Sequence, residues 1–163
     1  MDATSTQPSP SSSPSTSSVV EFYRGKSLFV TGATGFVGKV LVEKLLRSCP
    51  DVERIYLLMR AGARDGKPPS ARLKDLFQSR AFSFSPTPLA FDKVVAVAGD
   101  MTKPGLGLSK EDRQMLIDNV SVVFHSAATV KFHGPMKEFV AQNVLGTEAI
   151  MQLGAEMKKL QVC

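Results

Sequence analysis

Three glycines spaced three residues apart mark the segment Thr31-Gly32-Ala33-Thr34-Gly35-Phe36-Val37-Gly38. The apolar run Leu28 to Val30 precedes it, and apolar residues at helical spacing continue from Phe36 to Arg47. Between a strand and a helix, such glycines permit a tight turn, close approach of the backbone to a pyrophosphate, and close packing of the helix. The helix N-terminus adds N–H groups that favour an anion. The segment predicts a dinucleotide-binding turn, with a purely structural turn as the alternative, and the expected contacts are Thr31, Gly32, Thr34, Gly35, Phe36, Val37 and Gly38.

Arg60 follows the second apolar run, Ile55 to Met59. Dehydrogenases that prefer NAD place an acidic residue here against the ribose hydroxyls, whereas a guanidinium suits a 2′-phosphate. A charge-assisted contact of about 1.5–3 kcal/mol corresponds to a preference of roughly 10- to 100-fold. Arg60 therefore predicts NADPH as the cofactor, and an ordinary solvated arginine is the alternative.

Two further segments follow apolar runs, at the edge where open α/β sheets bind their ligands. Asp100 and Met101 come shortly after Val94 to Ala98. The Asp100 carboxylate could accept a hydrogen bond from adenine, or it could cap its own loop. Ala127 and Ala128 come after Val120 to Phe124, and their small side chains would let the backbone lie close to a cofactor. A plain tight loop fits these alanines almost as well.

Asn143 falls on the otherwise apolar face of the last predicted helix. A buried amide without partners costs about 1–3 kcal/mol, and either cofactor contact or bracing of the backbone would satisfy it. His125 and His133 lack a nearby carboxylate or cysteine that would complete a metal site, so we predict no metal and assign both to packing or surface roles. Cys49 and Cys163 show no disulfide framework, which suits a reducing compartment.

These residues require a strand-and-helix scaffold. Apolar runs predict strands at 26–31, 55–59, 94–98 and 120–124, and helical stripes predict helices at 36–47, at 70–79, from the N-cap Ser109 to about Asp118, and from Pro135 nearly to Cys163. Residues 82–91, with two prolines, are predicted to be irregular. The alternation predicts a Rossmann-type α/β fold, a doubly wound parallel sheet truncated after about four strands. Without a fifth strand, the edge at Val120 to Phe124 is expected to be open.

Composition limits the remaining possibilities. Residues 1–21, rich in Ser, Thr and Pro, predict a disordered tail before one domain at 22–163. The net charge of +5, with its basic surplus between Arg47 and Arg80, favours anionic ligands, although a solvated surface is the equal alternative. No arginine-rich tract indicates nucleic acid. The apolar runs are far shorter than the roughly 20 residues that span a bilayer, and a signal peptide is absent, so we predict no membrane segment in this chain.

Longer strings carry a resemblance. The glycine segment, the loop from His125 to Phe132 and the string Asn143-Val144-Leu145-Gly146-Thr147 resemble the extended short-chain dehydrogenase/reductase superfamily. Within it, Phe22 to Lys26, Val42 to Asp51 and Val123 to Phe132 look like the alcohol-forming fatty acyl-CoA reductases of animals. The resemblance runs from about Phe22 to the end and weakens across Ala81 to Phe91.

The resemblance implies NADPH-dependent reduction of long-chain fatty acyl-CoA to fatty alcohol in lipid biosynthesis, with association at peroxisomal, endoplasmic reticulum or other intracellular membranes. Such reductases use a Tyr-x-x-x-Lys pair, but the residues four positions after Tyr23 and Tyr56 are Ser27 and Arg60. We therefore expect an N-terminal fragment, inactive alone, that holds the cofactor. The alternatives are a non-catalytic nucleotide-binding or regulatory half-domain, and a sugar-nucleotide epimerase or dehydratase of the same superfamily.

Overall fold

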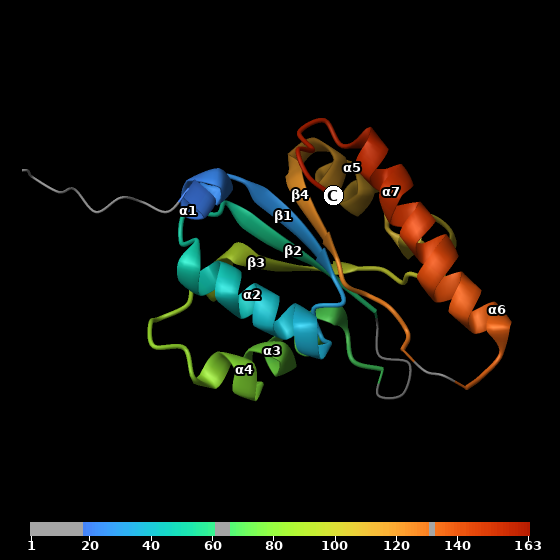
Figure 1. Ribbon diagram of the computed structural model, residues 1–163, viewed down its shortest axis with the longest axis horizontal. Coiled ribbons are helices and arrows are strands. Elements are labelled where there is room, and N and C mark those ends of the chain that lie inside the picture. Colours follow the sequence, from blue (N-terminus) through green and yellow to red (C-terminus); the bar gives the residue numbers. More distant parts are fainter. Residues whose placement is uncertain (1–17, 61–65, 131–132) are drawn as a thin grey trace, which may run out of the picture.

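The computed structural model describes residues 18–60, 66–130 and 133–163. Figure 1 shows a parallel sheet between two layers of helices. Its strands, β1 (Ser27–Thr31), β2 (Arg54–Met59), β3 (Val94–Ala98) and β4 (Val120–His125), lie in the order β3-β2-β1-β4. The predicted strands match these bounds to within one residue at each end. This order matches the first four positions of the doubly wound strand order 3-2-1-4-5-6, so the predicted fold class is confirmed.

Helices cover both faces of the sheet. α2 (Phe36–Ser48), α3 (Pro69–Phe77) and α4 (Arg80–Ser83) lie on one side, and α5 (Lys110–Asn119) and α7 (Gly146–Glu156) lie on the other (Figure 1). The predicted cap of α5 is confirmed, because the backbone N–H of Asp112 donates to Ser109 Oγ at 3.0 Å. A short 3₁₀ turn, η1 (Phe91–Lys93), precedes β3, and the turn η2 (Pro104–Gly107), with a left-handed backbone at Gly105 and Leu106, follows it.

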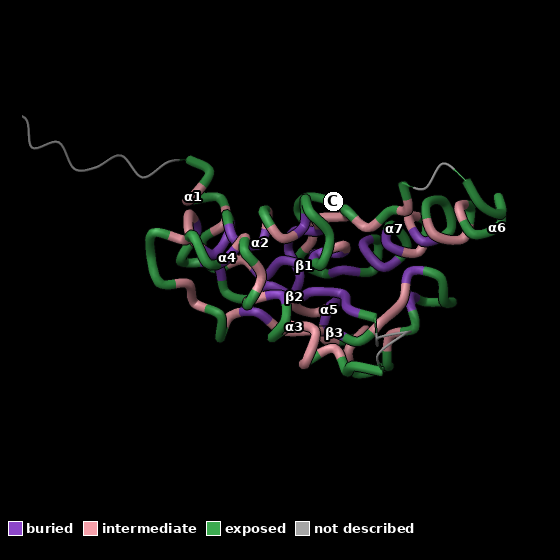
Figure 2. The backbone as a smooth tube through the Cα atoms, turned by 90° about the horizontal axis from the view of Figure 1, so that it is seen from below, coloured by how far each residue is buried: buried purple, intermediate pink, exposed green. Residues whose placement is uncertain are grey.

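The core follows from the alternation of side chains along the strands. In β1, Leu28 and Val30 pack in a cluster with the buried face of α2, whereas Phe29 packs in a second cluster with Leu116 and Ile150. Every residue of β1 is buried, as expected for a central parallel strand covered on both faces. Figure 2 shows the buried positions concentrated along the sheet and on the helix faces that meet it.

The C-terminal helix differs from its prediction in both continuity and length. It consists of α6 (Met136–Phe139), a π-helical segment η3 (Val140–Leu145) and α7, and it ends at Glu156 instead of nearly at Cys163. The apolar positions extend past the true end because Met157 and Leu160 pack into the core from a turn. Apolar spacing alone cannot distinguish such a turn from a further helical turn.

The last residues also correct the expected open edge of β4. The Gln161 N–H donates to Ser121 O at 2.8 Å, and Val123 N–H donates to Val162 O at 2.9 Å. Val162 forms a parallel bridge with Val122. The middle of the β4 edge is therefore paired by the chain itself.

The predicted tail boundary at residue 21 lies inside a helix, α1 (Ser18–Tyr23), so that boundary is wrong. The reason is hydrophobic anchoring: Tyr23 is partly buried against the core, and its ring centroid lies 6.3 Å from that of Phe124. The remainder of the predicted tail, residues 1–17, lies outside the described residues.

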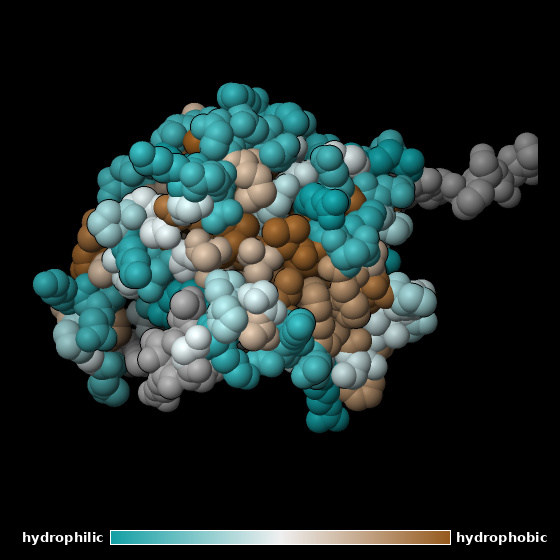
Figure 3. All heavy atoms as spheres, turned by 180° about the vertical axis from the view of Figure 1, so that it is seen from behind, coloured by the Kyte–Doolittle hydropathy of each residue, from teal (hydrophilic) through white to brown (hydrophobic). Residues whose placement is uncertain are grey.

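The segment before β3 is irregular over most of the predicted range, although α4 and η1 overlap its ends. Three aromatic rings hold it, with centroid distances of 4.2 Å for Phe77 and Phe91, 5.6 Å for Phe77 and Phe82, and 6.0 Å for Phe82 and Phe91. Figure 3 shows hydrophobic side chains gathered near the middle of the face seen from behind, with hydrophilic ones around them. Among the described helices, none combines the length and the apolar character needed to cross a bilayer.

Candidate cofactor site

A cleft lies where the carboxyl ends of the strands meet. Its cavity of about 200 Å³ is adjoined by a second of about 730 Å³, and both are lined by Arg60, Thr102, Ala128 and Gln142. Ligand sites in proteins commonly measure roughly 300–1,000 Å³. The adjoining cavities thus offer space for an extended ligand at the edge where doubly wound sheets bind nucleotides.

The glycine turn is shaped by close backbone contacts. Gly32 has φ +74°, and a Cβ there would lie 2.7 Å from Ala127 N and from Ser126 C, on the loop that follows β4. A Cβ on Gly38 would collide with Gly32 O and Ala33 Cα, which is the predicted close packing of helix and strand. The N-cap of α2 is Gly35, which has no side chain that could bond the first amides of the helix. The first amides of α2 are thereby left for an anion.

The structure brings most of the predicted site residues to one place. Those that line the first cavity are Gly32, Thr34, Gly35, Arg60, Asp100, Met101, Ala127 and Ala128. Those that do not are Thr31, Phe36, Val37, Gly38 and Asn143. Thr31 is buried beneath the turn, and the side chains of Phe36 and Val37 are 86% and 64% exposed. For Phe36 and Val37, contact through the backbone amides stays a prediction.

Arg72 is a residue that the sequence reasoning missed. It lies on α3 and lines the same cavity as Arg60, and its Nη1 donates to Arg60 O at 3.1 Å. Other members of the basic surplus are engaged elsewhere, since Arg47 pairs with Glu43 at 2.7 Å and Lys67 with Asp75 at 2.6 Å. Lys137 lines the second cavity, and Arg60 and Arg72 bring positive charge to the first. Their separation by 12 positions concealed the pairing.

Asp100 caps its own loop, which is one of the two predicted alternatives. Its Oδ1 accepts hydrogen bonds from Thr102 N at 2.9 Å and from Thr102 Oγ1 at 2.8 Å. Burial raises the pKa of Asp100, but the bonds from Thr102 and the nearby positive charge of Arg60 outweigh it and hold the pKa below its ordinary value. The ionised carboxylate also lines the cleft, so contact with adenine stays a prediction.

Asn143 braces the backbone and is exposed, so its predicted burial is wrong. The Thr129 N–H donates to Asn143 Oδ1 at 2.8 Å, and Asn143 Nδ2 donates to Thr129 O at 2.9 Å. No residue of the π-helical segment is buried, and the apolar Val144 beside Asn143 is 58% exposed, so the apolar face predicted here does not meet the core.

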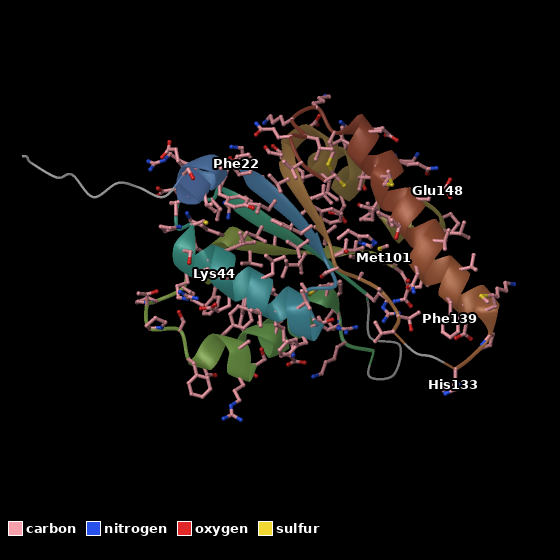
Figure 4. The ribbon with its side chains drawn as sticks, in the orientation of Figure 1. Phe22, Lys44, Met101, His133, Phe139 and Glu148 are labelled. Carbon is pink, nitrogen blue, oxygen red and sulfur yellow. The ribbon has the colours of Figure 1, made fainter. Side chains whose placement is uncertain are left out.

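His125 has a packing role, and each of its ring nitrogens forms a hydrogen bond. Its Nδ1 lies 2.6 Å from Thr31 Oγ1, and its Nε2 lies 3.0 Å from Thr147 Oγ1. Burial lowers the pKa of His125 because it disfavours the charged ring. His133 lies in the exposed turn before α6, well away from Met101 (Figure 4). Within the described residues, no three potential metal ligands gather.

Comparison with known proteins shows which proteins this chain is similar to. A fatty acyl-CoA reductase 1 from Xenopus laevis is 43% identical over 147 residues, and its human counterpart is 41% identical over the same length. These alignments cover 89% of this chain, which spans 28% of the length of those relatives. The terminal R domain from the myxalamid PKS-NRPS biosynthetic pathway has a similar fold, with a TM-score of 0.67 and 31% identity, over 85% of this chain and 34% of that domain.

The family described as "Male sterility protein", whose short name denotes an NAD-binding domain, matches residues 30–163. That match begins in β1, includes the complete glycine turn and extends over every strand of the sheet. The chain therefore belongs to this NAD-binding Male sterility protein family.

Proposed function

We propose that the complete protein reduces long-chain fatty acyl-CoA to fatty alcohol with NADPH, and that residues 22–163 hold the cofactor. The observation that carries this proposal is the cleft itself. The positive-φ turn at Gly32, the uncapped start of α2 and the alanines after β4 enclose one space, in a chain similar to fatty acyl-CoA reductases. NADPH supplies the hydride when it is bound there.

The residues present fit a dinucleotide that carries a 2′-phosphate. The pyrophosphate would lie against the amides at the start of α2, where the helix dipole favours negative charge. Arg60 follows β2 and Arg72 lies beside it, so both guanidinium groups could meet a 2′-phosphate on the adenine ribose. The choice of NADPH over NADH rests on these two arginines.

The proton donor of the reduction is proposed to lie outside residues 1–163. Tyr56 is buried in β2, and burial raises its pKa, which makes it a poor acid at neutral pH. Tyr23 lies at the end of α1, where it packs against Phe124. Since the chain spans 28% of its relatives' length, we expect it to bind cofactor without completing the reaction.

The test is an assay of the complete protein with hexadecanoyl-CoA and NADPH, with fatty alcohol and aldehyde identified by mass spectrometry. Hexadecanol formation with NADPH consumption is the expected result. NADPH binding without turnover would favour the non-catalytic half-domain. Turnover of a nucleotide sugar would favour an epimerase or dehydratase.

The site of action is proposed from the resemblance alone, as the peroxisomal membrane or the endoplasmic reticulum. Fluorescence microscopy of the tagged complete protein with organelle markers tests it. A signal spread through the cytosol would oppose the proposal.

A further inference from the structure

One face of the C-terminal helix makes three contacts near the cleft. Asn143 holds Thr129 in the loop after β4, through both of its amide atoms. Gly146 lies against the turn after β3, where a Cβ would be 2.8 Å from Met101 Cε and 3.1 Å from Met101 O. Thr147 meets His125 at the end of β4. Residues at i, i+3 and i+4 share a helix face, so one helix contacts the turn after β3, the end of β4 and the loop that follows β4.

The direction of each hydrogen bond around His125 is assigned from the Thr147 hydroxyl and its neighbours. Thr147 Oγ1 lies closer to the backbone oxygen of Asn143, at 2.8 Å, than to His125 Nε2, at 3.0 Å, so we assign its proton to that carbonyl. Thr147 can then only accept from His125, which requires a proton on Nε2. In a neutral imidazole this leaves Nδ1 bare.

The hydrogen bonds on the Nδ1 side of the His125 ring agree with this assignment. With Nδ1 bare, the Thr31 hydroxyl must donate to it across 2.6 Å. The oxygen of Thr31 in turn accepts from the N–H of Ala127 at 3.3 Å, and Ser126 Oγ donates to Thr31 O at 2.8 Å. The opposite tautomer would face Nε2, without a proton, toward a hydroxyl whose proton is already committed.

This series of hydrogen bonds ends at the backbone that forms the cleft. Ala127 and Gly32 both line the first cavity, and they approach so closely that a Cβ on Gly32 would lie 2.7 Å from Ala127 N. Thr31 precedes Gly32 directly and bonds the loop that contains Ala127. A change in the hydrogen bonding of the Thr31 hydroxyl would therefore affect both Gly32 and Ala127.

We propose that His125, with its proton on Nε2, is a positioning residue that couples the helix at Thr147 to the glycine turn through Thr31. His125 lines neither of the two described cavities, so we assign its influence on the cleft to its contact with Thr31. The consequence for the ligand rests on the proposed function, because the ligand is taken to be NADPH. The tautomer and the coupling do not rest on it.

The test uses three variants of the complete protein, labelled with ¹⁵N. Thr147→Val keeps the side-chain shape and removes the hydroxyl, Thr147→Ser restores the hydroxyl, and Thr87→Val is a matched control in an exposed loop outside the cleft. Long-range ¹H–¹⁵N spectra report the His125 tautomer, with His125→Asn for assignment. Amide resonances of Gly32 and Ala127 report the coupling, and calorimetric titration with NADPH reports the consequence.

We expect the Nε2–H tautomer in the wild type and in Thr147→Ser. In Thr147→Val, the tautomer signal should change, the Gly32 and Ala127 amides should shift, and NADPH affinity should fall about tenfold, as for loss of a buried hydrogen bond. Thr87→Val should match the wild type. Because Thr147→Ser restores only the hydroxyl, its recovery separates bonding from general packing.

An Nδ1–H tautomer in the wild type would overturn the proposal, and so would a Thr147→Val protein with unchanged Gly32 and Ala127 resonances. If the wild type binds no NADPH but the tautomer and amide shifts appear as expected, the proposed function fails and the coupling stands. If NADPH binds with equal affinity to wild type and Thr147→Val, the positioning role is overturned and the proposed function stands.

Discussion

The two walls of the cleft are built in different ways. The wall formed by β1 and α2 is defined by the absence of side chains, since a Cβ on Gly32 or Gly38 would strike backbone atoms. The wall formed by the loop after β4 is held by side chains from a helix 14 to 22 positions further along the chain. The first wall is therefore sensitive to added atoms, and the second is sensitive to lost hydrogen bonds.

Gly32→Ala, in the first wall, should have the largest effect, which is a loss of unfolding free energy. The residue would need a left-handed backbone, at about 1–2 kcal/mol, and its Cβ would press on Ala127 N, where overpacking costs about 1–3 kcal/mol. Gly25→Ala is the matched control, because Gly25 has φ +64° with nothing within 4 Å of a Cβ. Urea denaturation should show a clearly larger loss of unfolding free energy for Gly32→Ala. Equal losses would mean that the close contact is unimportant.

Arg60→Ala and Arg72→Ala test the positive charge that lines the first cavity. Each should weaken NADPH binding about tenfold, as for a charge-assisted hydrogen bond, and leave NADH binding unchanged. Arg80→Ala is the control, since that guanidinium lies over the ring of Phe84. Fluorescence titration of the complete protein measures all three. An equal loss for NADPH and NADH would remove these arginines from the 2′-phosphate site.

Asn143→Ala removes the brace of the second wall. Because the side chain is exposed, we expect the free energy of unfolding to fall by only about 1 kcal/mol. Hydrogen exchange at the Thr129 amide should become faster. The control Gln152→Ala removes an exposed amide, which bonds Glu148 on α7, and should leave that exchange unchanged. Unaltered protection of Thr129 in Asn143→Ala would show that the loop is held by other contacts.

The smallest expected effect is the pH dependence due to His125. Burial keeps its pKa below the ordinary 6.5, so the unfolded chain binds a proton more readily than the folded one. This contribution to stability is complete above about pH 6.5 and is lost as the pH falls toward the lowered pKa. His125→Gln should flatten this part of a stability–pH curve. An unchanged curve for His125→Gln would show that this pH dependence is not due to His125.

The same contrast explains what could be predicted from the sequence. The strands and the glycine turn rest on local signals, because apolar runs and glycine spacing each act within a few residues. Helix α5 likewise begins where the Ser109 cap predicted. These features needed no knowledge of distant partners.

The features that escaped prediction depend on distant partners. Arg72 joins Arg60 only after α3 folds back beside β2, and His125 meets Thr147 only through the C-terminal helix. The π-helical segment around Asn143 lies outside the core, and the pairing of Val162 with β4 replaced a predicted helical turn. Such outcomes follow from tertiary packing, which a periodic pattern does not contain.

A crystal structure of the complete protein with NADP⁺ tests the central claim most directly. We predict the pyrophosphate at the first amides of α2, close to Gly32 and Gly35, and the 2′-phosphate between Arg60 and Arg72. A dinucleotide bound elsewhere, or a 2′-phosphate turned away from both arginines, would contradict the account.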